Sequence, residues 1–206
     1  MKVSAIIPAL NEEKSVGEVV RRALAHVDEV IVVDDGSTDN TAAVAEAAGA
    51  TVIRHEKNRG ILEATASGIG AAEGDILVTL DSDGQHDPSE IPQLIAPILE
   101  DRADLVLGRR PSLPHFSEKA ITALTGLKVD VGDASTGFRA VKRSIAEKMK
   151  LHGSCLCGTL ILEAYRLGAR IAEIPITIRE RRDGRRRLNT RHLKQFFYVL
   201  YHLARP

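Results

Sequence analysis

The sequence has few cysteines and no long hydrophobic run, and each shortage excludes a class of protein. Its two cysteines, Cys155 and Cys157, are too few and too close together for the disulfide framework of a secreted domain. No segment reaches the roughly 20 apolar residues that cross a bilayer, and the apolar stretch near the N-terminus is too short for a signal peptide. We therefore expect a cytoplasmic protein in which both thiols are small buried hydrophobes of a helix.

The charges of the chain balance overall but are unevenly distributed. Residues 179–206 hold nine Lys or Arg and two acidic residues, a net charge of +7, so residues 1–178 carry −7. A basic end on an acidic body indicates an anionic partner for that end, while the acidic body argues against nucleic acid. The length of 206 residues, 44% of them hydrophobic, suits one α/β domain.

Strand-like and helix-like segments alternate through the first hundred residues. Apolar strands are predicted at 3–8, 29–33, 51–54, 76–80 and 104–107, with amphipathic or alanine-rich helices between them. This alternation predicts a Rossmann-like α/β fold, a mostly parallel sheet with helices on both faces. Beyond residue 111 the alternation loosens: residues 130–139 read as a loop, 169–178 as another strand and 193–203 as an amphipathic helix.

Polar clusters follow three of the predicted strands, where a parallel sheet forms its ligand crevice. They are Asn11 and Glu12, then Asp34 and Asp35, and finally Asp81, Ser82, Asp83 and Gln85. The oxygens of Asp81, Asp83 and Gln85 suit Mg²⁺ or Mn²⁺ holding a diphosphate, although a solvated acidic turn is the alternative. Asp34 and Asp35 are positioned to accept hydrogen bonds from a ribose or a nucleobase.

These motifs resemble those of family 2 glycosyltransferases of the GT-A fold, in family order from about residue 2 to 190. The matching segments include IIPALNEE (6–13), VIVVDDGSTDNT (30–41), HEKNRGILEA (55–64), LVTLDSDGQHDPSEIP (77–92), LVLGRR (105–110), ASTGFRAVKR (134–143) and DGRRRL (183–188). The pair of motifs D-x-D-x-Q and S-T-G-F-R is most similar to the dolichyl-phosphate mannose or glucose synthase branch. We expect a GT-A domain over 1–190 and a C-terminal amphipathic helix over 191–206.

The resemblance implies a role for each matching residue. A nucleotide-sugar donor contacts Pro8, Asn11, Glu12 and Asp35, with Asp34 and Ser82 in the same site, and Asp81, Asp83 and Gln85 bind Mg²⁺ or Mn²⁺ and the donor diphosphate. The catalytic set comprises Asp83, Arg110, Arg139 and Arg187. The three arginines suit phosphate recognition because a guanidinium binds oxyanions through two parallel hydrogen bonds.

The expected reaction is metal-dependent, inverting transfer of a hexose from a GDP- or UDP-sugar to a polyprenyl phosphate. A phosphate acceptor is already anionic near pH 7 and needs no general base. A sugar hydroxyl acceptor is the alternative, with Asp133 as its base, and a non-catalytic nucleotide-sugar-binding module is a second one. Four of the seven aromatic residues lie between 196 and 201. They suit a peripheral contact at the cytoplasmic membrane face or packing on the domain.

Overall fold

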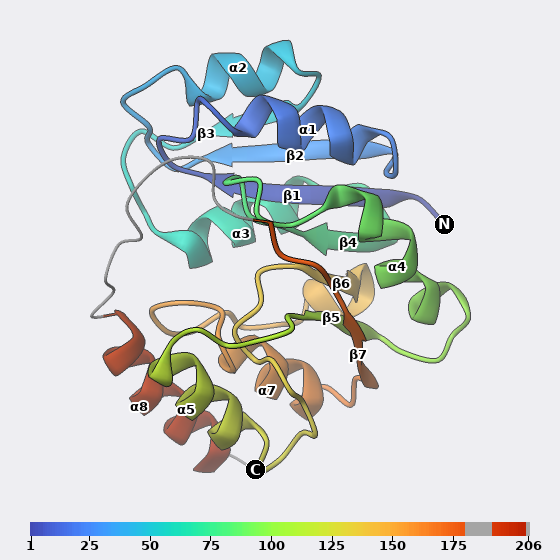
Figure 1. The fold of residues 1–206 in the computed structure, drawn as a ribbon, viewed down its shortest axis with the longest axis vertical. Coiled ribbons are helices and arrows are strands. Elements are labelled where there is room, and N and C mark those ends of the chain that lie inside the picture. The colour runs from blue at the N-terminus through green and yellow to red at the C-terminus, as the bar shows by residue number, and fades with distance from the viewer. Residues whose placement is uncertain (180–190, 205–206) are drawn as a thin grey trace.

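The computed structural model describes residues 1–179 and 191–204, apart from the side chains of 191–193. Within these ranges seven strands form one sheet in the order β3-β2-β1-β4-β6-β5-β7 (Figure 1). The strands are β1 (Val3–Ala9), β2 (Glu29–Asp34), β3 (Thr51–Arg54), β4 (Ile76–Thr79), β5 (Leu105–Arg109), β6 (Arg139–Lys142) and β7 (Ile171–Pro175). The mostly parallel α/β fold predicted from the sequence is confirmed.

The strand ends that carry the polar clusters lie at one edge of the sheet. β1 pairs in parallel with β2, where Ala9 lies opposite Asp34, and with β4, where Ile6 lies opposite Thr79. β1, β2 and β4 are almost wholly buried, as expected of strands that are covered on both faces. The loops that follow these three strands therefore emerge side by side.

The sequence does not predict β6, since residues 130–139 read as a loop. The four residues of β6 include only two apolar ones, too few for a strand periodicity to show. β6 runs antiparallel between β4 and β5, and its first residue, Arg139, lies opposite Thr79 and Leu107. This reversed direction brings the arginine to the edge where the parallel strands end.

Helices cover both faces of the sheet (Figure 1). One hydrophobic cluster joins the sheet to α1 (Val16–Leu24), α2 (Thr41–Ala47) and α4 (Ile91–Leu99), and the other joins it to α3 (Ile61–Ala71), α5 (Phe116–Thr125) and α7 (Thr159–Arg166). The short elements η1 (Pro88–Glu90) and α6 (Arg143–Ala146) follow β4 and β6. In α1 the buried Val16, Val19, Val20 and Ala23 recur at helical spacing and form the stripe that meets the sheet.

The last helix, α8 (Arg191–Ala204), packs on α5 and α7. Val199 is fully buried in that contact, whereas Phe197, Tyr198, Leu200 and Tyr201 are exposed on the outside of the helix. The predicted amphipathic helix is thus present. Among the described residues, no helix combines the length and the apolar character needed to cross a bilayer.

Candidate active site

A cavity of about 760 Å³ lies at the edge of the sheet where β4, β5 and β7 end. Asp81 and Gln85 from the loop after β4 line it together with Arg110 from the loop after β5. Ser135 and Gly137, just before β6, also line it. The cavity occupies the position at which open α/β sheets bind ligands.

Gly137 fixes the position of the Asp81 carboxylate in this cavity. A Cβ atom at residue 137 would lie 2.5 and 2.6 Å from the two carboxylate oxygens of Asp81, so only glycine allows this approach. On the other side, His86 Nδ1 lies 3.6 Å from Asp81 Oδ2, and the His86 ring stacks on Phe138 at 5.3 Å. The Asp81 side chain nevertheless remains 52% exposed, which leaves it accessible to a ligand.

The three predicted metal ligands are not all in one cavity. Asp81 and Gln85 line the large cavity, whereas Asp83 lines a small one beside α1 and accepts a hydrogen bond from Gln85 N at 3.0 Å. Residues 1–179 and 191–204 contain no group of three His, Cys, Asp or Glu suited to hold a metal. Mg²⁺ commonly takes only one or two carboxylates and completes its coordination with substrate phosphates and water. Asp81 and Gln85 bring one carboxylate and one amide oxygen to the large cavity, a ligand set of the kind that an ion shared with a diphosphate uses.

Arg139 is a buried cation with unused hydrogen-bonding capacity. Its side chain lines a cavity of about 120 Å³ next to Asp81 and Ser135. Within the described residues neither Arg139 Nε nor Ser135 Oγ has a hydrogen-bond partner. Burial lowers the pKa of Arg139, and the charge of Asp81 opposes that effect only in part. Buried polar groups are normally satisfied, so these two atoms can hydrogen-bond to a ligand bound in the cavity that both residues line.

Arg110 is held by two carboxylates instead. Its Nε and Nη2 donate to the two oxygens of Asp133 at 2.7 and 3.0 Å, and Nη1 lies 3.4 Å from Glu118 Oε1. Burial alone would lower the pKa of Arg110, but the hydrogen bonds and charges of Asp133 and Glu118 raise it. Asp133 is fully buried and also accepts from Ser135 N at 3.0 Å. This geometry weighs against Asp133 as a general base.

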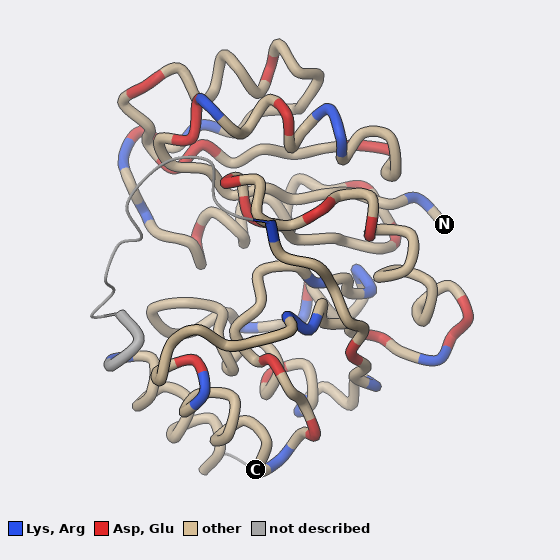
Figure 2. Tube along the Cα trace, in the orientation of Figure 1, with Lys and Arg blue, Asp and Glu red and all other residues tan. Residues whose placement is uncertain are grey.

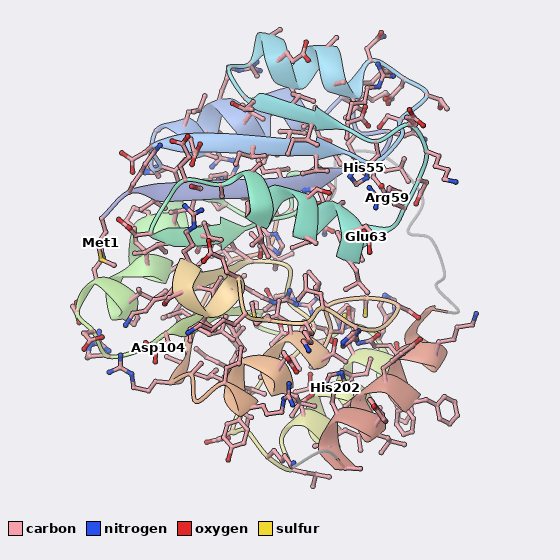
Figure 3. The ribbon with its side chains drawn as sticks, turned by 180° about the vertical axis from the view of Figure 1, so that it is seen from behind. Met1, His55, Arg59, Glu63, Asp104 and His202 are labelled. Carbon is pink, nitrogen blue, oxygen red and sulfur yellow. The ribbon has the colours of Figure 1, made fainter. Side chains whose placement is uncertain are left out.

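Asp35 organises the start of α3. Its Oδ1 accepts from Arg59 N at 2.9 Å and contacts His55 Nδ1 at 2.8 Å, and its Oδ2 accepts from Gly60 N at 2.8 Å. His55, Arg59 and Glu63 lie together there (Figure 3). Sequence reasoning gave His55 no role, because it is 20 residues from Asp35 and only the pairing of β2 with β3 joins them.

The other predicted donor contacts hold the loop after β2 against the end of β1. Asp34 is buried and accepts from Ser37 N at 2.9 Å, while Asn11 Oδ1 accepts from Thr38 N at 2.8 Å. Glu12 N donates to Thr41 Oγ1 at 2.8 Å. Figure 2 shows acidic segments (red) in these loops.

The remaining predicted residues are placed as follows. Pro8 lines the smaller cavity with Arg139, and Ser82 is buried in the loop after β4. Arg187 lies outside the described residues. The binding and catalytic roles of the whole set stay predictions.

Comparison with known proteins places the chain in a family. The model of "Glycosyl transferase family 2" matches residues 4–125. The UDP-N-acetylglucosamine–dolichyl-phosphate N-acetylglucosaminyltransferase of Methanococcus voltae is 32% identical over an alignment of 208 residues. The alignment covers 83% of this chain and 83% of that protein. The dolichol-phosphate mannosyltransferase of Pyrococcus furiosus is 31% identical over 231 residues, covering 100% of this chain and 64% of that protein.

Solved structures agree with this assignment. Glucosyl-3-phosphoglycerate synthase from Mycobacterium tuberculosis, in complex with phosphoglyceric acid, superposes with a TM-score of 0.87 at 27% identity and covers 100% of this chain and 81% of that chain. The same enzyme in complex with Mn²⁺, UDP-glucose and phosphoglyceric acid has a TM-score of 0.85 at 26% identity and covers 100% and 80%. The chain therefore belongs to glycosyl transferase family 2 and is a glycosyltransferase of the GT-A fold.

Proposed function

We propose that this chain transfers a hexose from a GDP- or UDP-sugar to a polyprenyl phosphate, with inversion at the anomeric carbon and with Mg²⁺ or Mn²⁺. The observation that carries the proposal is the buried Nε of Arg139, which has no hydrogen-bond partner among the described residues and lines a cavity with Ser135 and Asp81. Two relatives that cover much of the chain are named for transfer to dolichyl or dolichol phosphate, which supports a lipid phosphate as the acceptor.

The donor side of the proposal rests on the loop after β4. Asp81, Asp83 and Gln85 would hold the divalent ion, whose chemistry is to stabilise the charge of the departing diphosphate. Asp35 and its neighbours would hold the nucleoside at the ends of β1 and β2. Complexes of the mycobacterial enzyme with Mn²⁺ and UDP-glucose support a metal on this fold.

The acceptor side rests on the arginines. An oxygen of the acceptor phosphate bonds to the anomeric carbon while the bond from that carbon to the diphosphate oxygen breaks, which releases the nucleoside diphosphate. The phosphate oxygen is already anionic, so no proton has to be removed. Arg139, with Arg110 and Arg187, would hold this phosphate. The buried ion pair between Asp133 and Arg110 supports a reaction without a base.

A lipid acceptor requires contact with a membrane surface, and α8 offers the face for it. Phe197, Tyr198, Leu200 and Tyr201 are exposed, and aromatic side chains next to a basic segment favour the interface of an anionic membrane. We propose a peripheral contact of this face with the cytoplasmic leaflet.

A hydroxyl acceptor that carries a phosphate is the second candidate. The superposition with an enzyme bound to phosphoglyceric acid favours it, because Arg139 would receive that phosphate equally well. Such an acceptor needs a general base, however, and Asp133 is fully buried and paired. A non-catalytic nucleotide-sugar-binding module is the third reading.

One screen separates these functions. GDP- and UDP-sugars are incubated with Mg²⁺, Mn²⁺ or EDTA and with polyprenyl phosphate, 3-phosphoglycerate or no acceptor. We expect metal-dependent transfer to polyprenyl phosphate that Asp81→Asn abolishes and that Asp130→Asn, a change at an exposed aspartate, leaves intact. Transfer only to 3-phosphoglycerate would establish the second candidate, and donor binding without any turnover the third.

A further inference from the structure

The C-terminal helix reaches the acceptor side of the site through one buried side chain, Gln195. This residue of α8 has no exposed surface. Its Oε1 accepts from Ser154 N at 2.8 Å and from Cys155 N at 3.2 Å. Its Nε2 donates to Cys157 O at 2.7 Å and to Thr159 Oγ1 at 3.1 Å. A glutamine amide offers two acceptor sites and two donor hydrogens. All four are used in hydrogen bonds to the segment 154–159.

The segment that Gln195 binds forms a wall of the Arg139 cavity. Cys155, Leu156 and Cys157 line that cavity together with Arg139. The two thiols are half buried in the loop before α7, so the prediction that they are buried hydrophobes of a helix is wrong. Three residues of this loop therefore share the cavity with the arginine.

The loop depends on contacts from outside itself for its shape. Gly153 and Gly158 have φ of 124° and 72°, values that favour glycine and lie outside helix or strand geometry. A Cβ atom at residue 153 would lie 2.5 Å from Gln195 Oε1, so the backbone approaches the amide closely. Gly158 N donates to Ala134 O at 3.0 Å, which joins the loop to the segment that carries Ser135.

The helix has other buried contacts with the domain besides Gln195. Val199 of α8 is fully buried among α5 and α7 residues, and His202 Nδ1 lies 3.8 Å from Glu163 Oε2 at the other end of the helix. His202 lies on the part of α8 that meets the domain (Figure 3). These contacts hold the helix through other side chains, whereas the amide of Gln195 bonds to residues 154–159.

We propose that Gln195 is a positioning residue for the transfer reaction, which holds loop 153–158 so that the Arg139 cavity keeps the shape that receives the acceptor phosphate. The inference rests on the proposed function for the identity of the acceptor. It makes α8 part of the acceptor site instead of an appendage to the domain.

The test compares three variants. Gln195→Met keeps the length of the side chain and removes all four hydrogen bonds. Gln195→Glu keeps the acceptor for Ser154 N and Cys155 N but loses the donor. Lys148→Gln changes an exposed residue away from α8 and from the cavity and is the control. Thermal unfolding shows which variants fold. If Gln195→Met does not fold, the test of the proposal rests on Gln195→Glu.

Two readouts are followed. Because the chain has two cysteines and both lie in this loop, the rate of N-ethylmaleimide labelling, measured by intact mass, reports on the loop alone. Steady-state kinetics give KM for polyprenyl phosphate and for the nucleotide sugar separately. We expect Gln195→Met to label about tenfold faster and to raise the acceptor KM about tenfold or more, since small displacements of a binding group are costly. The donor KM should stay within about twofold, with Gln195→Glu intermediate and Lys148→Gln unchanged.

An unchanged acceptor KM in a variant whose loop labels faster would overturn the proposal, as would an equal rise in both KM values. Failure of the proposed function appears differently, as absence of transfer by the wild-type chain. In that case the cavity is tested with inorganic phosphate. Phosphate that slows labelling of the wild type but not of Gln195→Met supports the positioning role, and equal protection of both refutes it.

Discussion

The tight approach of Gly137 to Asp81 yields the sharpest prediction, for Gly137→Ala. Ordinary contact begins at 3.4 Å, and the new Cβ would lie 2.5 Å from the nearest Asp81 oxygen, so the carboxylate must move by the difference of about 0.9 Å. The φ angle of Gly137 is not positive, so alanine can adopt the same backbone conformation. We therefore expect the fold to persist. Displacement of a group that holds the metal and diphosphate by nearly 1 Å should lower kcat by about 10- to 100-fold, or about 1.4 to 2.7 kcal/mol of transition-state stabilisation.

The assay is transfer or donor hydrolysis at saturating nucleotide sugar, with thermal unfolding measured on the same preparations. Gly70→Ala is the matched control, because a Cβ at that position in α3 meets no atom within 4 Å. It should keep full activity and gain about 0.4 to 1 kcal/mol of stability. Wild-type turnover by a folded Gly137→Ala variant would refute the assignment of Asp81 to the reacting site.

Three further changes test the buried charges. Arg139→Met should reduce transfer to polyprenyl phosphate by at least about 100-fold without lowering the thermal midpoint, because it removes a buried cation whose Nε has no partner in the part of the chain that the structure describes. A fall in both transfer and thermal midpoint would contradict a binding role. Asp133→Asn should cost about 3 kcal/mol in urea unfolding, since it breaks the buried pair with Arg110, whereas a general base would show lost kcat at unchanged stability. The pKa of Asp87 is lowered: burial opposes ionisation, but hydrogen bonds from Ser89 and the charges of Arg22 and Arg179 together outweigh it. Its stabilising effect is therefore present above the unfolded pKa of about 4 and lost as pH falls through the folded value. In urea unfolding measured at a series of pH values, Asp87→Asn should therefore lose less free energy of unfolding than the wild type as the pH falls below about 4.

Local sequence pattern was sufficient to place the parallel strands and the loops that follow them. Continuous apolar runs mark strands buried on both faces, and each run ends in its polar cluster within one or two residues. The position of Asp81 at the end of β4, and of Asp34 and Asp35 at the end of β2, followed from that rule alone. The family motifs added the expected roles.

Only the tertiary structure decided which of these residues meet. Arg139 reaches the site because a four-residue strand with two apolar residues runs antiparallel between β4 and β5, a pairing that no short pattern encodes. Asp133 changes from a candidate base to the partner of Arg110 because two loops 23 residues apart fold together. Gln195 reaches its loop across about 40 residues. Local propensity fixes elements, whereas contacts between distant residues depend on how the elements pack, and the acceptor side of this site is made of such contacts.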